Sequence, residues 1–146
     1  MVKLKINGLK VLLLMVTTVS FSGCFQYPDG PFFTVQTRTE RINGTWRLTS
    51  VTDENGADIS SEFQNITLAS LVDRSGNSSW SVFQDGYLIS FGTFTFAEHG
   101  NELIVVYTLL NGGQTDTQEF YSIQKLTDKH FNYIDLNNAE LHFDKY

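Results

Sequence analysis

An alternating pattern begins at Gly44-Thr45 and continues through Trp46-Arg47-Leu48-Thr49-Ser50-Val51-Thr52. Successive side chains of an extended strand point to opposite faces, so this stretch places Trp46, Leu48 and Ser50 together on one face. A period of two that follows a glycine predicts a strand over residues 46–52 that starts beside a turn.

Seven further stretches continue this pattern toward the C-terminus, and each is bounded by Gly, Asn or Asp. They cover residues 66–72, 78–83, 87–96, 103–110, 117–126, 131–136 and 140–146. Short connections make consecutive strands antiparallel neighbours. Closure of such a sheet leaves no exposed edge, so residues 44–146 are predicted to form an all-β, eight-stranded antiparallel up-and-down barrel. A twisted open sandwich is the alternative.

Three local features refine this prediction. Within residues 87–96 the apolar positions shift by one residue at Gly92, which predicts a β-bulge there. One helical turn is expected, at residues 60–63, with Ser60 as its cap. Turns are expected where Gly and Asn reach positive φ at low cost, at residues 85–86, 99–101, 111–113 and 137–138.

The N-terminus has the three parts of a secretory signal peptide. A basic stretch runs to Lys10, an apolar stretch covers residues 11–19, and small residues lead to Cys24. The apolar stretch is shorter than the roughly 20 residues that span a membrane, so residues 1–23 are predicted to be a cleaved leader. The run Phe21-Ser22-Gly23-Cys24 resembles the lipobox of bacterial lipoproteins. This resemblance implies that Cys24 receives a diacylglyceryl group and becomes the lipidated N-terminus.

Cysteine usage supports the lipid anchor. Cys24 is the only cysteine of the chain, so it has no intramolecular disulfide partner, and a lone exported thiol would be a liability. Two or more acyl chains hold a protein on a membrane essentially permanently, so the membrane is the first expected partner. The alternative is a generic secretory signal whose cleavage site lies beside a cysteine.

The charge of the chain is distributed unevenly. Residues 24–146 carry seven Lys and Arg against sixteen Asp and Glu, which gives this part a net charge of −9. Because the binding of nucleic acid depends on Lys and Arg contacts to phosphate, so acidic a surface excludes nucleic acid as a partner.

Two stretches resemble the lipocalin-like domain lipoproteins of Bacteroidota, which are small calycin-type β-barrel lipoproteins. They are the opening residues 33–51 and the closing residues 121–131 with 140–143, and the order and spacing match over residues 33–146. Gly44-x-Trp46 is similar to the G-x-W signature of true lipocalins. The resemblance implies that Trp46 plugs the closed end of the barrel and that a basic residue of the last strand stacks on it. Lys145 is the only basic candidate there apart from His142.

Residues 24–43 are predicted to be a tether between the lipidated Cys24 and the barrel, because both prolines of the chain lie there beside the turn signal Asp29-Gly30. Surface-exposed lipoproteins of Bacteroidota tend to carry an acidic run after the lipidated cysteine, whereas only Asp29 lies within six positions of Cys24 here. Phe25, where an inner-membrane retention signal would have Asp, follows the cysteine. The expected location is therefore the outer membrane, facing the periplasm.

No constellation of residues indicates catalysis, so the chain is not expected to be an enzyme. The three histidines, His99, His130 and His142, are not spaced as metal ligands are, and no metal or cofactor is expected. Asp53-Glu54 precedes the turn residues Asn55-Gly56 and is expected to be solvated loop charge rather than an acid–base pair.

The aromatic residues carry the functional hypothesis. A barrel of eight strands is either filled by side chains or holds one small ligand, and ring-lined, weakly polar pockets suit apolar ligands. A cavity should open at the end that holds residues 53–64, 84–86, 111–116 and 136–139, where the resemblance implies that the first connection acts as a lid. The candidate ligand-binding residues near that end are Phe83, Tyr87, Tyr107 and Tyr133.

The leading hypothesis is thus a lipid-anchored, lipocalin-like binding module of the bacterial cell envelope for a small apolar ligand. The alternative is an interaction protein with a solid barrel, such as a hydrolase inhibitor or an envelope assembly partner, that binds through its loops.

Overall fold

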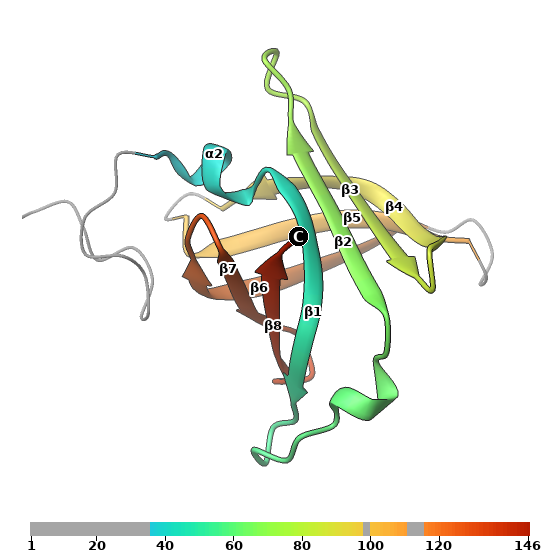
Figure 1. The fold of residues 1–146 in the computed structure, drawn as a ribbon. Coiled ribbons are helices and arrows are strands. Elements are labelled where there is room, and N and C mark those ends of the chain that lie inside the picture. Colours follow the sequence, from blue (N-terminus) through green and yellow to red (C-terminus); the bar gives the residue numbers. More distant parts are fainter. Residues whose placement is uncertain (1–35, 98–99, 111–115) are drawn as a thin grey trace, which may run out of the picture.

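The structure, a computed structural model, describes residues 36–97, 100–110 and 116–146 and contains a closed barrel of eight strands (Figure 1). The strands are β1 (Gly44–Thr52), β2 (Ile66–Val72), β3 (Ser78–Gln84), β4 (Tyr87–Phe96), β5 (Glu102–Leu109), β6 (Asp116–Leu126), β7 (His130–Ile134) and β8 (Glu140–Lys145). Each strand pairs antiparallel with the next one, and β8 pairs antiparallel with β1. The predicted eight-stranded up-and-down barrel is confirmed, and the sheet is not an open sandwich.

Two short helices accompany the barrel, α2 (Arg38–Ile42) and the 3-10 turn η1 (Ser60–Glu62). The sequence predicts η1, although its N-cap is Ile59 and not the expected Ser60. It does not predict α2, which lies inside the segment expected to be a tether. Thr37 caps α2: its hydroxyl accepts from the Glu40 backbone N–H, and the Glu40 carboxylate accepts from the Thr37 backbone N–H at 2.6 Å. These bonds satisfy N–H groups that the first turn of a helix leaves unpaired, which explains how five residues form a helix. In the part of the chain that is described, no helix is long and apolar enough to cross a membrane.

The two ends of the barrel differ. At one end α2 packs beside β2 and β6, and this end, with the connections β2–β3, β4–β5 and β6–β7, is called the closed end (Figure 1). The opposite end, where β1–β2, β3–β4, β5–β6 and β7–β8 connect, is called the mouth.

Turn chemistry fixes the short connections. At the mouth Asp85 and Gly86 have φ of 52° and 82°, the left-handed conformation that a two-residue hairpin turn needs. The carboxylates of Asp53, Asp73 and Asp135 each accept from backbone N–H groups two and four residues later, which stabilises three further turns.

Two bulges change which side chains point inward. The register of β1 against β8 shifts between Leu48 and Ser50, so that Val51 is buried where the sequence predicts Ser50. In β4 the extra residue is Ile89, at the shift opposite Val82 and Phe83, and not Gly92 as predicted. Phe91 consequently faces outward and is exposed.

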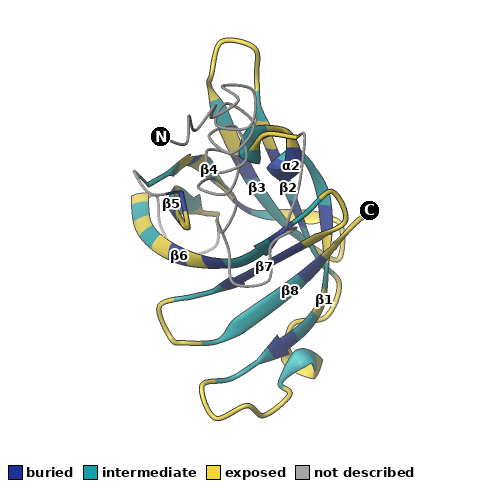
Figure 2. Ribbon diagram, turned by 90° about the vertical axis from the view of Figure 1, so that its left-hand side faces the viewer, coloured by how far each residue is buried: buried dark blue, intermediate teal, exposed yellow. Residues whose placement is uncertain are grey.

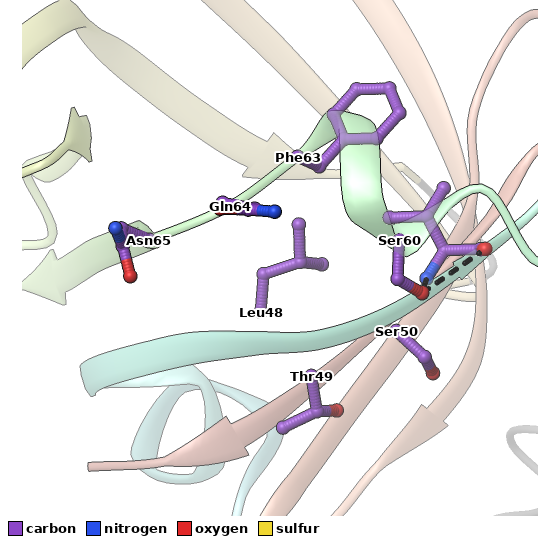
Figure 3. A pocket seen from close by; sticks show the side chains of 8 residues that line it. Leu48, Thr49, Ser50, Ser60, Phe63, Gln64 and Asn65 are labelled. Atoms are coloured by element: carbon purple, nitrogen blue, oxygen red, sulfur yellow. Dashed lines mark hydrogen bonds between the residues drawn. The ribbon is translucent and has the colours of Figure 1, made fainter.

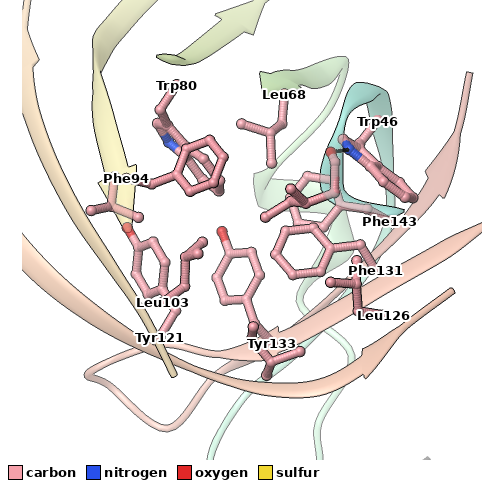
Figure 4. Packing of buried hydrophobic residues seen from close by; sticks show 13 residues of the cluster. Trp46, Leu68, Trp80, Phe94, Leu103, Tyr121, Leu126, Phe131, Tyr133 and Phe143 are labelled. Atoms are coloured by element: carbon pink, nitrogen blue, oxygen red, sulfur yellow. Dashed lines mark hydrogen bonds between the residues drawn. The ribbon is translucent and has the colours of Figure 1, made fainter. Parts of the chain in front are cut away.

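The core fills the half of the barrel next to the closed end. Along β5 and β6 buried positions alternate with exposed ones (Figure 2). The ring of Phe131 packs against Trp46 with centroids 5.8 Å apart, and Trp80 packs edge-on against Phe94 at 5.9 Å (Figure 4). Large rings thus leave little room in this half of the interior.

Candidate functional site

Trp46 forms the plug of the closed end. Its side chain is 0% exposed, and its indole Nε1 donates to the Ile42 carbonyl at 2.9 Å and to the Ser70 hydroxyl at 3.2 Å. The Lys145 ammonium lies 4.8 Å from the centre of the Trp46 ring. A Cβ on Gly44 would lie 2.5 Å from Lys145 Cε. A glycine at this position therefore leaves room for the Lys145 side chain to reach the Trp46 ring.

Buried polar groups at the closed end have partners. The guanidinium of Arg41, in α2, donates to the Leu126 carbonyl at 2.8 Å, and the Ser70 hydroxyl donates to the Ile42 carbonyl at 2.6 Å. Because buried polar atoms cost free energy only when they lack partners, this end is a stable structural closure.

A carboxylate lies inside the half of the barrel next to the mouth. Glu119 alternates with Thr117 and Tyr121 on the inner face of β6 and is partly buried. Its two oxygens accept separate hydrogen bonds, from the Tyr107 hydroxyl at 2.7 Å and from the Tyr121 hydroxyl at 2.5 Å. Two neutral donors thus fix the position of one negative charge inside the barrel.

Tyr133 lies next to this group, and its ring stacks on that of Tyr121 with centroids 4.5 Å apart. It is 6% exposed, and its hydroxyl points away from β7 into the barrel interior (Figure 4). Within residues 36–97, 100–110 and 116–146 this hydroxyl has no hydrogen-bond partner. The hydroxyl of Ser90, which is 5% exposed and on the inner face of β4, lacks one as well. Such groups are rare in native interiors, and each requires an explanation.

Burial keeps the tyrosines neutral. Burial and the hydrogen bond to Glu119 raise the pKa of Tyr107 to about 12. Burial also raises the pKa values of Tyr121 and Tyr133 well above the ordinary value, and neighbouring charges add to the effect. At neutral pH all three hydroxyls therefore keep their protons and remain hydrogen-bond donors.

A cavity of about 270 Å³ opens on the mouth side between β1 and the β1–β2 connection (Figure 3). The β1–β2 ladder ends at the pair Arg47–Thr67, so the later residues of β1 diverge from β2. The Ser60 hydroxyl accepts from the Val51 backbone N–H at 2.9 Å and holds η1 against β1. Leu48 lines the cavity and also packs against the core, so the cavity adjoins the barrel interior. Its lining residues are Leu48, Thr49, Ser50, Val51, Ser60, Phe63, Gln64 and Asn65.

The structure separates the four aromatic residues predicted to bind a ligand. Tyr107 and Tyr133 face the interior and meet around Glu119. Phe83 pairs with Thr67 on the outer face, and Tyr87 is 78% exposed, so the prediction that these two rings face inward is wrong. Phe83 faces outward because it follows Val82, which packs against the core, in regular alternation, whereas Tyr87 pairs with Gln84 at the first position of β4 and is exposed at the mouth. Cys24 lies outside the described residues.

Sequence analysis missed Glu119, although a signal for it exists. Residues 117, 119, 121 and 123 share one face of a strand, and Tyr121 and Ile123 identify that face as the inner one. A glutamate at such a position is unusual, because charged residues are seldom buried.

The histidines lie away from this group. His130 contacts Asp144 at 2.7 Å and His142 contacts Glu140 at 3.2 Å, while His99 lies outside the described residues. Across the described ranges no three His, Cys, Asp or Glu side chains are placed to hold a metal ion.

Comparison with known proteins supports the fold. A lipocalin-like protein from Bacteroides uniformis superposes with a TM-score of 0.50 at 16% identity, over 73% of this chain and 99% of that one. A protein from Burkholderia xenovorans (TM-score 0.48, 15% identity, 82% of this chain and 97% of that one) and a redesigned β-barrel (0.46, 14%, 78% and 99%) are also similar. No protein-family model and no curated protein matches the chain. The chain thus has a lipocalin-like β-barrel fold.

Proposed function

We propose that this protein is a lipid-anchored binding module of the bacterial cell envelope that takes a small, largely apolar ligand into the mouth half of its barrel. The observation that carries this proposal is the contrast between the two halves of the interior. Buried polar groups at the closed end are paired, whereas the buried hydroxyls of Tyr133 and Ser90 near the mouth have no partner in the described structure. A polar group of a ligand in this half of the barrel would give such a hydroxyl its missing partner.

The shape of the interior supports the same site. Along the inner face of β4 the large rings of Phe96 and Phe94 lie near the closed end, whereas the small side chain of Ser90 lies nearer the mouth. The side chains of β4 therefore fill less of the barrel interior near the mouth than near the closed end. The cavity beside Leu48, at about 270 Å³, approaches the lower end of the range for small-ligand pockets and opens at the same end of the barrel.

Thermal melts test ligand binding directly. A ligand that binds only the folded protein stabilises it by about 2.7 kcal/mol at a hundredfold excess over its dissociation constant. The mature chain, residues 24–146 with Cys24→Ser, is melted with fatty acids, short-chain phospholipids, isoprenoid alcohols and alkyl amines. We expect at least one class to raise the Tm in a saturable way, and a panel without any such shift would contradict the proposal.

The lipid anchor rests on Phe21-Ser22-Gly23-Cys24, and its test is separate. The Cys24→Ser precursor should stay uncut and lack lipid, because the thiol that receives the diacylglyceryl group is gone. Release of this variant with the same mature N-terminus as the wild type would show that the leader is an ordinary secretory signal. Fractionation of the wild type would then show whether the protein lies in the outer membrane.

A further inference from the structure

We propose that the ligand carries a protonated amine, which enters the mouth and is held between the Glu119 carboxylate and the Tyr133 hydroxyl. This inference rests on the proposed function and adds the chemical class of the ligand.

Glu119 has the geometry to receive an amine. Tyr107 and Tyr121 each donate one hydrogen bond to a different oxygen of Glu119. A carboxylate accepts about four hydrogen bonds, so two acceptor positions are left for a ligand. No Lys, Arg or His of the described ranges forms an ion pair with Glu119. An ammonium group would supply both missing donors and the missing positive charge in a place partly shielded from water.

Tyr133 brings a second contact of the same kind. Its ring stacks on Tyr121, which itself bonds Glu119, and the charge of Glu119 contributes to the raised pKa of Tyr133, so the two side chains lie near each other. A hydroxyl oxygen accepts hydrogen bonds, and the faces of tyrosine rings attract cations. An amine can donate to both acceptors at once, whereas a carboxylate ligand would meet Glu119 as a like charge.

The chain segments that lie in the mouth half of the barrel carry the charge that an amine ligand requires. Residues 48–66, 82–92, 105–121 and 133–142 contain nine Asp and Glu and no Lys or Arg, whereas all seven Lys and Arg of residues 24–146 lie in the remaining segments. Clefts lined by charge of one sign concentrate ligands of the opposite sign. The mouth therefore attracts amines and repels fatty acids.

Two of these acidic groups are held in the ionised form by local hydrogen bonds. The backbone N–H of Ala57 lowers the pKa of Asp53, and the side chain and backbone of Ser60 lower the pKa of Asp58. The negative potential of the mouth thus persists at mildly acidic pH.

A matched ligand series tests the inference. Decylamine, decanol and decanoate share one chain length and differ only in the polar group, and their affinities for the mature chain are measured by calorimetry at neutral pH, below the concentration at which each aggregates. We expect decylamine to bind at least tenfold more tightly than decanol, and decanoate more weakly than decanol. Equal affinities, or a preference for decanoate, would overturn the inference and leave the proposed function standing. Absence of binding by all three, with no shift from the wider panel, would overturn both.

Variants distinguish binding of the amine at Glu119 from a general attraction of the cation to an acidic protein. Glu119→Gln should remove most of the preference for decylamine over decanol, whereas Glu54→Gln removes the same charge from an exposed turn and should keep it. Tyr133→Phe should weaken decylamine severalfold, and the exposed control Tyr87→Phe should not. If Glu119→Gln and Glu54→Gln behave alike, and both tyrosine variants behave as wild type, the amine does not bind at Glu119.

Discussion

The ammonium group of Lys145 lies 4.8 Å from the centre of the Trp46 ring and donates to the Arg41 carbonyl at 3.4 Å. The last strand, the first strand and α2 therefore meet at one point, which closes the barrel. In the lipocalin-like pattern a basic residue of the last strand stacks on the tryptophan, and a lysine takes that place here.

Trp46→Ala should strongly destabilise the barrel, because the indole is fully buried and its Nε1 has two partners. Replacing a buried Trp by Ala costs about 3 to 5 kcal/mol, a large share of the stability of a small domain. Urea unfolding followed by circular dichroism measures the loss. A loss below about 1 kcal/mol would show that Trp46 does not plug the core.

Lys145→Met keeps the apolar stem of the side chain and removes its charge. We expect a loss of about 0.5 to 2 kcal/mol, the range for a cation over an aromatic face. Lys129→Met is the control, because Lys129 is exposed at the same end of the barrel. Equal losses in the two variants would mean that the contact with Trp46 contributes nothing.

Gly92→Ala should be poorly tolerated although Gly92 lies in a regular strand. A Cβ at this position would lie 1.9 Å from the Val106 carbonyl oxygen, a backbone atom that moves only if β5 moves. Overpacking of this kind costs about 1 to 3 kcal/mol or more. Gly76→Ala meets no atom within 4 Å but has φ of +86°, so its cost is the backbone term of about 1 kcal/mol. A smaller loss for Gly92→Ala than for Gly76→Ala would contradict the close approach of β4 and β5.

Alkaline titration tests the hydroxyl groups around Glu119. The pKa of Tyr107 is raised from 10.0 to about 12, so the folded state holds this proton more tightly than the unfolded state. The resulting stabilisation is complete below pH 10 and is lost as the pH rises through about 12. The tyrosinate absorbance of the wild type minus that of Tyr107→Phe should rise near pH 12. A difference curve centred at pH 10 would show that Tyr107 is not buried against Glu119.

The strand order follows from the sequence, and so do the strand ends to within two residues, because alternation with a period of two and Asp, Asn or Gly at the turns is a local signal. Residues 66–72 and 87–96 form strands as predicted, for example. α2 could not be predicted from periodicity, because five residues are too few to show a helical repeat. Its one local signal is Thr37 with Glu40 three residues later, which is the pattern of a capping box.

The candidate site could be predicted only in part. Tyr107 and Tyr133 face inward as the alternation of β5 and β7 requires. Phe83 and Tyr87 do not. Val82 and Phe83 are adjacent apolar residues, so the local sequence does not tell which of them faces inward, and Tyr87 is the first residue of β4, where its side chain is exposed at the mouth. The sequence suggests Gly92 for the bulge, but this glycine is instead needed where β5 approaches β4.

A ligand that enters the mouth half of the barrel should contact the group around Glu119. Amide chemical shifts of the mature chain, recorded by NMR while decylamine and then decanol are added, test this most directly. We expect saturable changes at Tyr107, Glu119, Tyr121 and Tyr133, with little change at Trp46 or at the outward-facing Phe83. Changes confined to outward-facing residues such as Phe83, Tyr87 and Phe91, with the interior residues unaffected, would contradict it.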